Sequence, residues 1–89
     1  MAKPGYIILF PSADIIEPSR IGNFAEDLWR ALHPTGLGDV PNEPTAHADR
    51  EVRVEVSAPR HLSRTLRAIR SLLHRHNLDP HDAVVSRLK

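Results

Sequence analysis

The chain of 89 residues contains no cysteine, only four aromatic side chains and no long apolar run. Without cysteine it can form no disulfide, no thiol nucleophile and no thiolate metal site. Its longest apolar run, residues 6–10, is much shorter than the run of roughly 18 apolar residues that a membrane-spanning helix needs. We therefore expect a cytoplasmic protein that makes no membrane contact and folds as a single domain over residues 1–89.

The two parts of the chain differ in charge, although the formal net charge is only +1. Residues 1–58 hold nine acidic and five basic side chains, whereas residues 59–89 hold two acidic and seven basic ones. The stretch of residues 58–78, APRHLSRTLRAIRSLLHRHNL, contains five arginines, three histidines and no acid. This stretch is either a nucleic-acid-binding helix or a helix whose outer face is basic and solvated.

The spacing of apolar residues predicts the first two elements. Residues 6–10, YIILF, are apolar on both faces, which predicts a central strand. Residues 19–33 carry one apolar stripe at helical spacing, which predicts a helix. Its N-cap is either Ser19 or Asn23, because Asn23 and Glu26 form a capping-box-like pair. The stripe consists of Ile21, Phe24, Ala25, Leu28 and Leu32.

The middle of the chain contains one irregular segment and one clear strand. Residues 35–49 have no periodicity and form either a loop throughout or a loop with a short edge strand at residues 36–40, since Pro41 is tolerated only at a sheet edge. Residues 51–57, EVRVEVS, alternate strictly, which predicts a strand with its valines buried. The opposite face is expected to carry the polar side chains of Arg53, Glu55 and Arg87.

A second helix is predicted within residues 58–78, because an apolar stripe lies on one side of it and basic residues on the other. Pro59 suits the first turn, with Ser57 or Ala58 as the N-cap. The stripe consists of Leu62, Leu66, Ile69, Leu72 and Leu73, and the basic face of Arg60, Arg64, Arg67, Arg70 and His74.

The end of this helix also has a recognisable pattern. Asn77 can take the left-handed C′ position, from which Leu78 reaches back to Leu73 in a Schellman ending. A turn at residues 79–80 then leads to a last strand near residues 83–88.

The predicted order is therefore strand, helix, optional short strand, strand, helix, strand. This order predicts an α+β domain of the ferredoxin-like βαββαβ type, with two helices on one face of an antiparallel sheet. If residues 36–40 are a loop, the sheet is reduced to three strands.

The segment LWRALHPTGLGDV, a polar loop with Asn42 and Glu43, and the strand and amphipathic helix that follow resemble a class of small bacterial ferredoxin-like proteins. These proteins often read G-x-G-E-V-D-G-x-E at the loop; here Gly36, Gly38, Asp39, Val40 and Glu43 match, whereas Pro41 and Asn42 replace the usual Asp-Gly. The resemblance covers residues 24–87. It implies a ferredoxin-like fold and an immunity protein of a bacterial toxin system, and it implies no catalytic residues.

The histidines follow no pattern that indicates metal binding or catalysis. His74 and His76 are two residues apart, so on a helix they point about 200° away from each other and cannot bind the same ion. The other four histidines lie in or beside predicted loops without the spacing of a metal motif, and no glycine-rich phosphate loop is present. We therefore expect a protein that is not an enzyme and uses no metal or cofactor.

The acidic loop predicts binding to another protein. Its carboxylates attract a basic partner, because charge complementarity speeds encounter and sets specificity. The resemblance implies that this partner is a basic toxin domain; a second copy of the chain, in a homodimer, is the alternative. The predicted partner-binding residues are Asp39, Glu43, Asp49 and Trp29.

The alternative function is nucleic-acid binding through the basic face of the second helix. Arginines that neutralise phosphates give a protein affinity for nucleic acid of any sequence. The strand EVRVEV, however, carries none of the aromatic side chains on which exposed bases stack in single-strand binders. Protein binding is the favoured prediction, because the sequence shows no catalytic machinery and the resemblance points to protein binding.

Overall fold

The structure is a computed structural model of the chain. It describes residues 4–11, 16, 18–41, 43–48, 51–58, 61–78 and 83–87, with the backbone alone described at residues 18 and 45–48. The described residues form β1 (Gly5–Phe10), α1 (Pro18–Leu32), β2 (Thr45–Ala48), β3 (Glu51–Ser57), α2 (Leu62–Arg75) and β4 (Val84–Arg87).

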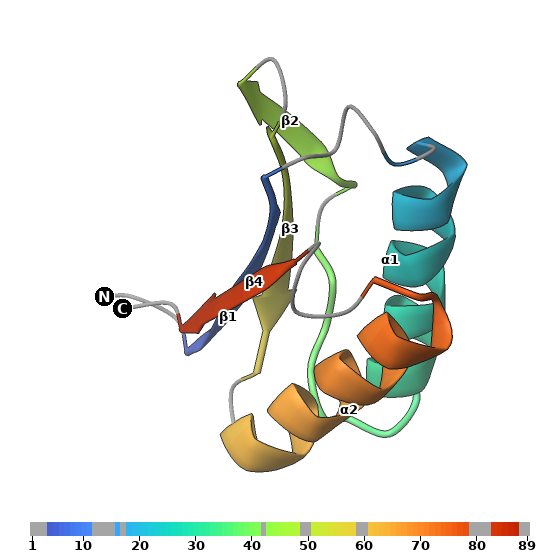
Figure 1. Cartoon of the computed structure of the whole chain (residues 1–89). Coiled ribbons are helices and arrows are strands. Elements are labelled where there is room, and N and C mark those ends of the chain that lie inside the picture. Colours follow the sequence, from blue (N-terminus) through green and yellow to red (C-terminus); the bar gives the residue numbers. More distant parts are fainter. Residues whose placement is uncertain are drawn as a thin grey trace.

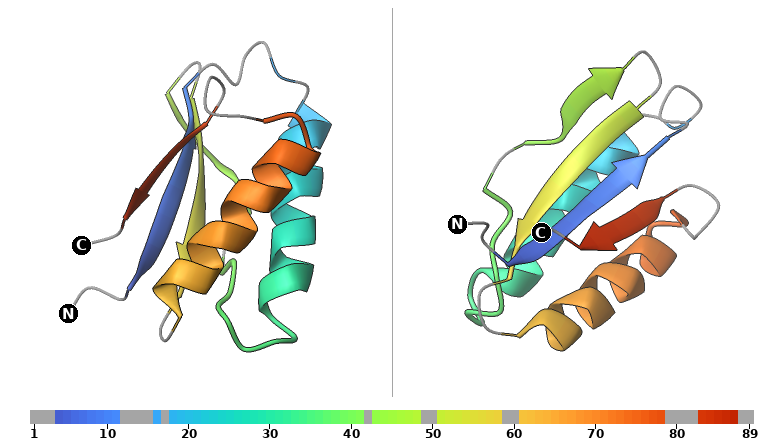
Figure 2. Two further views of the ribbon diagram at one scale, coloured as in Figure 1. Left: turned by 60° about the horizontal axis from the view of Figure 1, so that its bottom comes forward. Right: turned by 90° about the vertical axis from the view of Figure 1, so that its left-hand side faces the viewer.

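The strands form one antiparallel sheet in the order β2-β3-β1-β4, so β1 is central, as predicted. Both helices lie on the same face of the sheet, and no described helix covers the opposite face (Figure 1 and Figure 2). The prediction of an α+β domain with two helices on one face of an antiparallel sheet is therefore confirmed.

The pairing register assigns each strand residue to one face of the sheet. Residues directly opposite each other in antiparallel strands point to the same face. Ile8 lies opposite Val54 of β3 and Val85 of β4, and both Ile8 and Val54 are fully buried. These positions face the helices, so their neighbours in β1, Ile7 and Leu9, belong to the open face of the sheet.

Arg87 does not lie on the open face with Arg53 and Glu55, contrary to the prediction. It is paired with Tyr6, whose side chain is buried in the core, so Arg87 belongs to the face that carries the helices. Val84 lies on the open face instead and is 48% exposed. A shift of one residue in the register moves every side chain of a strand to the opposite face of the sheet. The sequence of the short β4 alone therefore could not show which of its residues face the helices.

The edge strand lies later in the chain than the sequence suggested. Residues 36–40 form a loop in which Asp39 makes an isolated bridge to Ser57, so of the two predicted alternatives the loop is found. The sheet nevertheless has a fourth strand, contrary to the expectation of three strands for that alternative. The edge strand is β2. Pro41 and Pro44 have no N–H to donate, which explains why regular pairing starts only after them.

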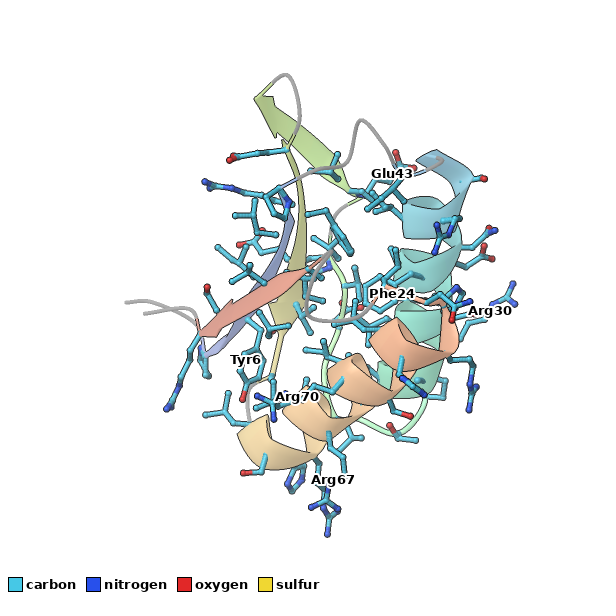
Figure 3. All side chains as sticks on the ribbon, viewed as in Figure 1. Tyr6, Phe24, Arg30, Glu43, Arg67 and Arg70 are labelled. Atoms are coloured by element: carbon cyan, nitrogen blue, oxygen red, sulfur yellow. The ribbon has the colours of Figure 1, made fainter. Side chains whose placement is uncertain are left out.

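α1 begins at Pro18, whose missing N–H is tolerated in the first turn of a helix. Ser19 and Asn23, the two predicted N-caps, therefore both lie inside the helix, and neither prediction was right. Glu26 forms an ion pair with Arg30 at 2.7 Å, on the outer side of the helix (Figure 3). The predicted apolar stripe is confirmed, since Ile21, Phe24, Ala25, Leu28 and Leu32 are all buried.

α2 begins at Leu62, after Pro59, so the predicted start at Pro59 is wrong. Its N-cap is His61, which makes no capping bond through its side chain. Ser57, one of the predicted caps, is instead the last residue of β3, and its carbonyl and N–H both pair with Asp39, at 2.9 and 2.8 Å. The N–H of Ala58, the other predicted cap, donates to the carbonyl of Pro4 at 3.0 Å, and neither residue lies at the start of α2.

The end of α2 has the predicted geometry. Asn77 has a φ of 57°, in the left-handed region. The N–H of Leu78 donates to the carbonyl of Leu73 at 2.7 Å, and the N–H of Asn77 donates to the carbonyl of His74 at 3.0 Å. These two bonds define a Schellman motif, so that prediction is confirmed.

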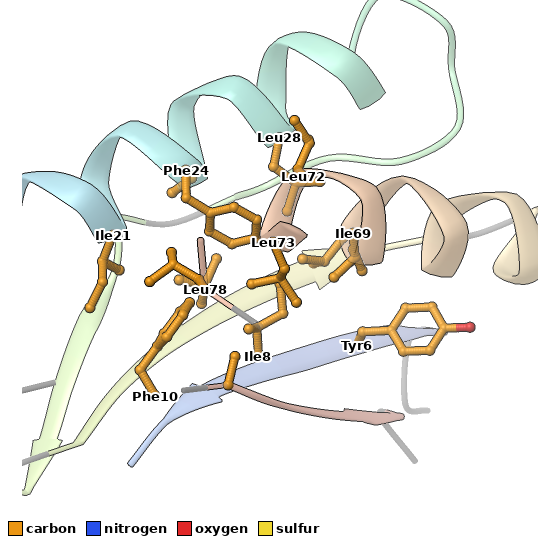
Figure 4. Close-up of a cluster of buried hydrophobic side chains, with 14 of the residues drawn as sticks. Tyr6, Ile8, Phe10, Ile21, Phe24, Leu28, Ile69, Leu72, Leu73 and Leu78 are labelled. Atoms are coloured by element: carbon orange, nitrogen blue, oxygen red, sulfur yellow. The ribbon is translucent and has the colours of Figure 1, made fainter. Parts of the chain in front are cut away.

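The core fills the space between the sheet and the two helices (Figure 4). Phe10, Phe24 and Ile69, from β1, α1 and α2, are fully buried. The rings of Phe10 and Phe24 meet edge to face, with their centroids 6.0 Å apart. Full burial of such a side chain contributes about 1.5–3 kcal/mol, so the contacts between the layers hold both helices on the sheet.

Candidate functional site

The loop that follows α1 is attached both to the sheet and to α2. The N–H of Asp39 donates to the carbonyl of Ser57 at 2.9 Å, and the N–H of Ser57 donates back at 2.8 Å. Thr65 of α2 is fully buried and donates its hydroxyl to the carbonyl of Leu37 at 3.2 Å. These bonds determine the path along which the loop returns beside α1.

The two glycines of this loop serve different structural purposes. Gly36 has a φ of 70°, a left-handed conformation that other residues adopt only with strain. Gly38 lies so close to the end of β3 that a methyl group on it would overlap the carbonyl oxygen of Ser57. The G-x-G pattern thus combines a turn with a close approach of two backbone segments.

A hollow of about 550 Å³, here called the α1 groove, lies between α1 and residues 40–44. Gly22, Ala25 and Trp29 line it from α1, where spacings of three and four residues place them on one side of the helix. A Cβ atom at Gly22 would meet nothing within 4 Å, so the missing side chain leaves the groove open. The opposite, mainly apolar wall consists of Val40, Pro41, Glu43 and Pro44.

Trp29 is the most exposed aromatic side chain of the described residues, at 41%. Its indole stacks on the imidazole of His33, with centroids 4.8 Å apart and an angle of 17° between the rings. This contact orients the indole, while another part of the ring borders the α1 groove. The structure thus places Trp29 and Glu43, two of the predicted partner-binding residues, around the same groove.

The α1 groove has a carboxylate on each wall. Glu26 comes from α1 and Glu43 from the loop, as Figure 3 shows for Glu43 beside α1. The ion pair of Glu26 with Arg30 joins side chains that are 57% and 66% exposed, so it is weak and can be exchanged for another cation. Two carboxylates and an indole around an apolar floor are suited to a cationic side chain with an aliphatic stem.

The other acidic residues of the prediction have different positions. Asp39 does not line the α1 groove; its carboxylate accepts the N–H of Val40 at 2.9 Å and lies 3.7 Å from Nδ1 of His33. It therefore helps to hold the wall of the groove, with its side chain 48% exposed. Asp49 lies outside the described residues.

Sequence reasoning missed six residues that line the α1 groove: Gly22, Ala25, Glu26, Val40, Pro41 and Pro44. It interpreted Glu26 as part of a capping box and Ala25 as part of the apolar stripe of the helix. No local signal links these residues to the loop, because the two segments become neighbours only when the loop is attached to Ser57.

The contacts that join the ends of the two helices were also missed. Arg20 of α1 donates to the carbonyls of His76 and Asn77 at 3.0 and 3.1 Å, where α2 ends. Nε2 of His76 lies 2.8 Å from Oδ2 of Asp27, with the His76 side chain 18% exposed. His76 is thus partly buried at the end of α2.

The predicted basic face of α2 is exposed. Arg64, Arg67, Arg70 and His74 all lie on its outer side, and Figure 3 shows Arg67 pointing away from the core. Arg60 lies outside the described residues. The basic face and the α1 groove belong to different helices and are separate surfaces.

Among the described residues, no group of three or more histidines, aspartates and glutamates is placed to hold a metal ion. No described helix is long and apolar enough to cross a membrane. Comparison of the chain with family models, with curated proteins and with solved structures finds no match.

Proposed function

We propose that this chain is a non-enzymatic protein-binding module that holds a cationic side chain of its partner in the α1 groove. The observation that carries the proposal is the presence, around one hollow, of the exposed indole of Trp29 and the carboxylates of Glu26 and Glu43. The stem of an arginine packs on the apolar walls, its charged head meets the carboxylates, and its guanidinium stacks on the indole.

We also propose that the fold is ferredoxin-like, of the βαββαβ type. The chain order β1, α1, β2, β3, α2, β4 supports this proposal, as does the strand order β2-β3-β1-β4, in which β3 is inserted between the two strands of a βαβ unit.

For the partner we propose a basic domain of a bacterial toxin, which makes the chain an immunity protein. The resemblance of residues 24–87 to small ferredoxin-like proteins of this type supports the proposal. The carboxylates of Asp39 and Glu43 on the loop add to it, because acidic groups at an interface steer a basic partner toward it.

Trp29 is the only tryptophan of the chain, so its fluorescence reports on the α1 groove directly. The probes are a blocked Gly-Leu-Arg-Leu-Gly peptide and the same peptide with neutral citrulline in place of arginine. We expect a saturable change in emission with the arginine peptide and about tenfold weaker binding of the citrulline peptide, which corresponds to roughly 1.4 kcal/mol. Equal binding of the two peptides would contradict the proposal.

A matched pair of variants locates the binding. Gly22→Leu fills the α1 groove without a clash on the backbone, because nothing lies near the Cβ position there. Asn23→Leu places the same side chain on the exposed surface one residue further along α1, away from the lining. We expect Gly22→Leu to abolish peptide binding and Asn23→Leu to leave it unchanged; if both bind normally, the site is elsewhere.

The toxin partner is tested with the protein encoded by the neighbouring gene. We expect it to co-purify with this chain and to be neutralised by it in cells. The double variant Glu26→Gln with Glu43→Gln, which keeps the shape of both side chains, should lose both properties. If light scattering instead shows a dimer that the same double variant dissociates, the partner is a second copy of the chain.

A further inference from the structure

The outer side of α2 has an unusual composition. All seven of its exposed residues are arginine, histidine or serine, and α2 contains no acid. They are Ser63, Arg64, Arg67, Arg70, Ser71, His74 and Arg75. Every one of these side chains can donate hydrogen bonds and none is anionic, so this face is suited to a ligand that only accepts them.

The arginines of this face are not used inside the molecule. No ion pair or side-chain hydrogen bond joins Arg64, Arg67 or Arg70 to another part of the described chain. Arg30 of α1, in contrast, is paired with Glu26. Like charges three residues apart repel each other, and no acid in the first turn of α2 offsets Arg64 at the positive end of the helix dipole. Arg64, Arg67 and Arg70 therefore do not stabilise the fold.

The arginines spread across the outer side of α2. At about 100° per residue, Arg64 and Arg70 mark two edges about 120° apart, and Arg67 lies between them. The 14 residues of α2 give it a length of about 21 Å. The convex outer side of α2 thus carries one arginine at each edge and one between them.

We propose that the outer side of α2 binds the phosphate backbone of double-stranded DNA, with the helix in the major groove and without sequence preference. A helix about 10–12 Å across fits a groove about 12 Å wide, and the arginines at the two edges reach the phosphates on both sides. Phosphates accept hydrogen bonds and donate none, which matches a face of donors. No Asn or Gln, the residues that read adenine, is exposed on α2.

Two other polyanionic ligands fit less well. A single strand requires aromatic platforms for its bases, and no exposed residue of α2 is aromatic. A membrane surface requires a free apolar face, whereas Ile69, Leu72 and Leu73 of α2 are buried in the core. Duplex DNA needs only the charged face, which is exposed.

The experiment measures binding of a labelled 25-base-pair duplex of mixed sequence at several salt concentrations. Each arginine that contacts a phosphate adds about 0.9 to the slope of log K against log salt. In the variant with Arg64→Gln, Arg67→Gln and Arg70→Gln, we expect this slope to fall by about 2 to 3.

The control variant carries Arg30→Gln, Arg53→Gln and Arg87→Gln, which removes the same charge from other exposed or partly exposed positions. It should bind the duplex nearly as well as the unmodified chain. Equal losses in both variants would mean that net charge alone drives binding, and this would overturn the proposal. No binding at low salt, or tighter binding to a single strand or to phosphatidylserine vesicles, would overturn it too.

This inference does not depend on the α1 groove. Gly22→Leu is expected to leave DNA binding unchanged, and the arginine variant is expected to leave peptide binding unchanged. Failure of one proposal can therefore be distinguished from failure of the other.

Discussion

The two helices cover the same face of the sheet, yet they present different chemistry to solvent. α1 has a mixed outer surface, where Glu26 and Arg30 are paired and Trp29 borders a groove closed by the following loop. α2 exposes only arginine, histidine and serine. The buried side of a helix is selected for shape and apolarity, which α1 and α2 share. Their outer sides are free to differ, and this difference is the basis of the two separate binding proposals.

Both helices bury an apolar side in the core. Truncation of a buried side chain in either helix should therefore have the largest effect on the free energy of unfolding. Phe24→Ala should lower the free energy of unfolding by about 3–5 kcal/mol, and Ile69→Ala by about 2–5 kcal/mol, because both side chains are fully buried. Urea titration followed by circular dichroism measures both. A loss below 1 kcal/mol for either would show that its helix is not held by this core.

The α1 groove distinguishes α1 from α2. One of its walls is formed by the loop after α1, and this loop attaches to β3 where Gly38 approaches Ser57 closely. Gly38→Ala should cost about 1–3 kcal/mol and abolish peptide binding, because the added methyl group overlaps the backbone of Ser57. DNA binding by the fraction that folds should not change. Gly22→Ala is the matched control: it meets no atom, so it should raise stability by about 0.5–1 kcal/mol. A fully stable Gly38→Ala variant would contradict the described attachment of the loop.

The smallest expected effects on stability come from substitution of one arginine on the outer surface of each helix. Arg30→Gln removes an ion pair four residues apart on α1 and should cost about 0.3–0.5 kcal/mol. Arg67→Gln removes a charge that is flanked by other arginines and has no carboxylate partner among the described residues, so stability should stay constant or rise slightly. Thermal unfolding at low and high salt measures both. Equal costs for the two would contradict the contrast between the outer surfaces.

Much of the fold could be predicted because it is encoded in short repeating patterns. The alternation of β3, the stripes of both helices and the Asn77 ending of α2 involve only residues close in sequence. Predictions failed where a hydrogen bond between segments distant in sequence overrode the local preference of a residue. Ser57 suits an N-cap by its side chain, but its N–H and carbonyl are already paired with Asp39 at the end of β3. Pro41 suggested a strand just before it, whereas the edge strand follows Pro44.

The candidate site shows the same division. The sequence by itself determined which side chains are chemically suited to a partner: the single tryptophan, the loop carboxylates and a helix whose outer side is basic. These are properties of residue type and periodicity. Only the tertiary structure decided that Glu26, Trp29 and Glu43 surround one hollow while Asp39 supports its wall. The reason is physical: the close approach of Gly38 to Ser57 brings residues 40–44 beside α1, and no pattern within either segment encodes that distance.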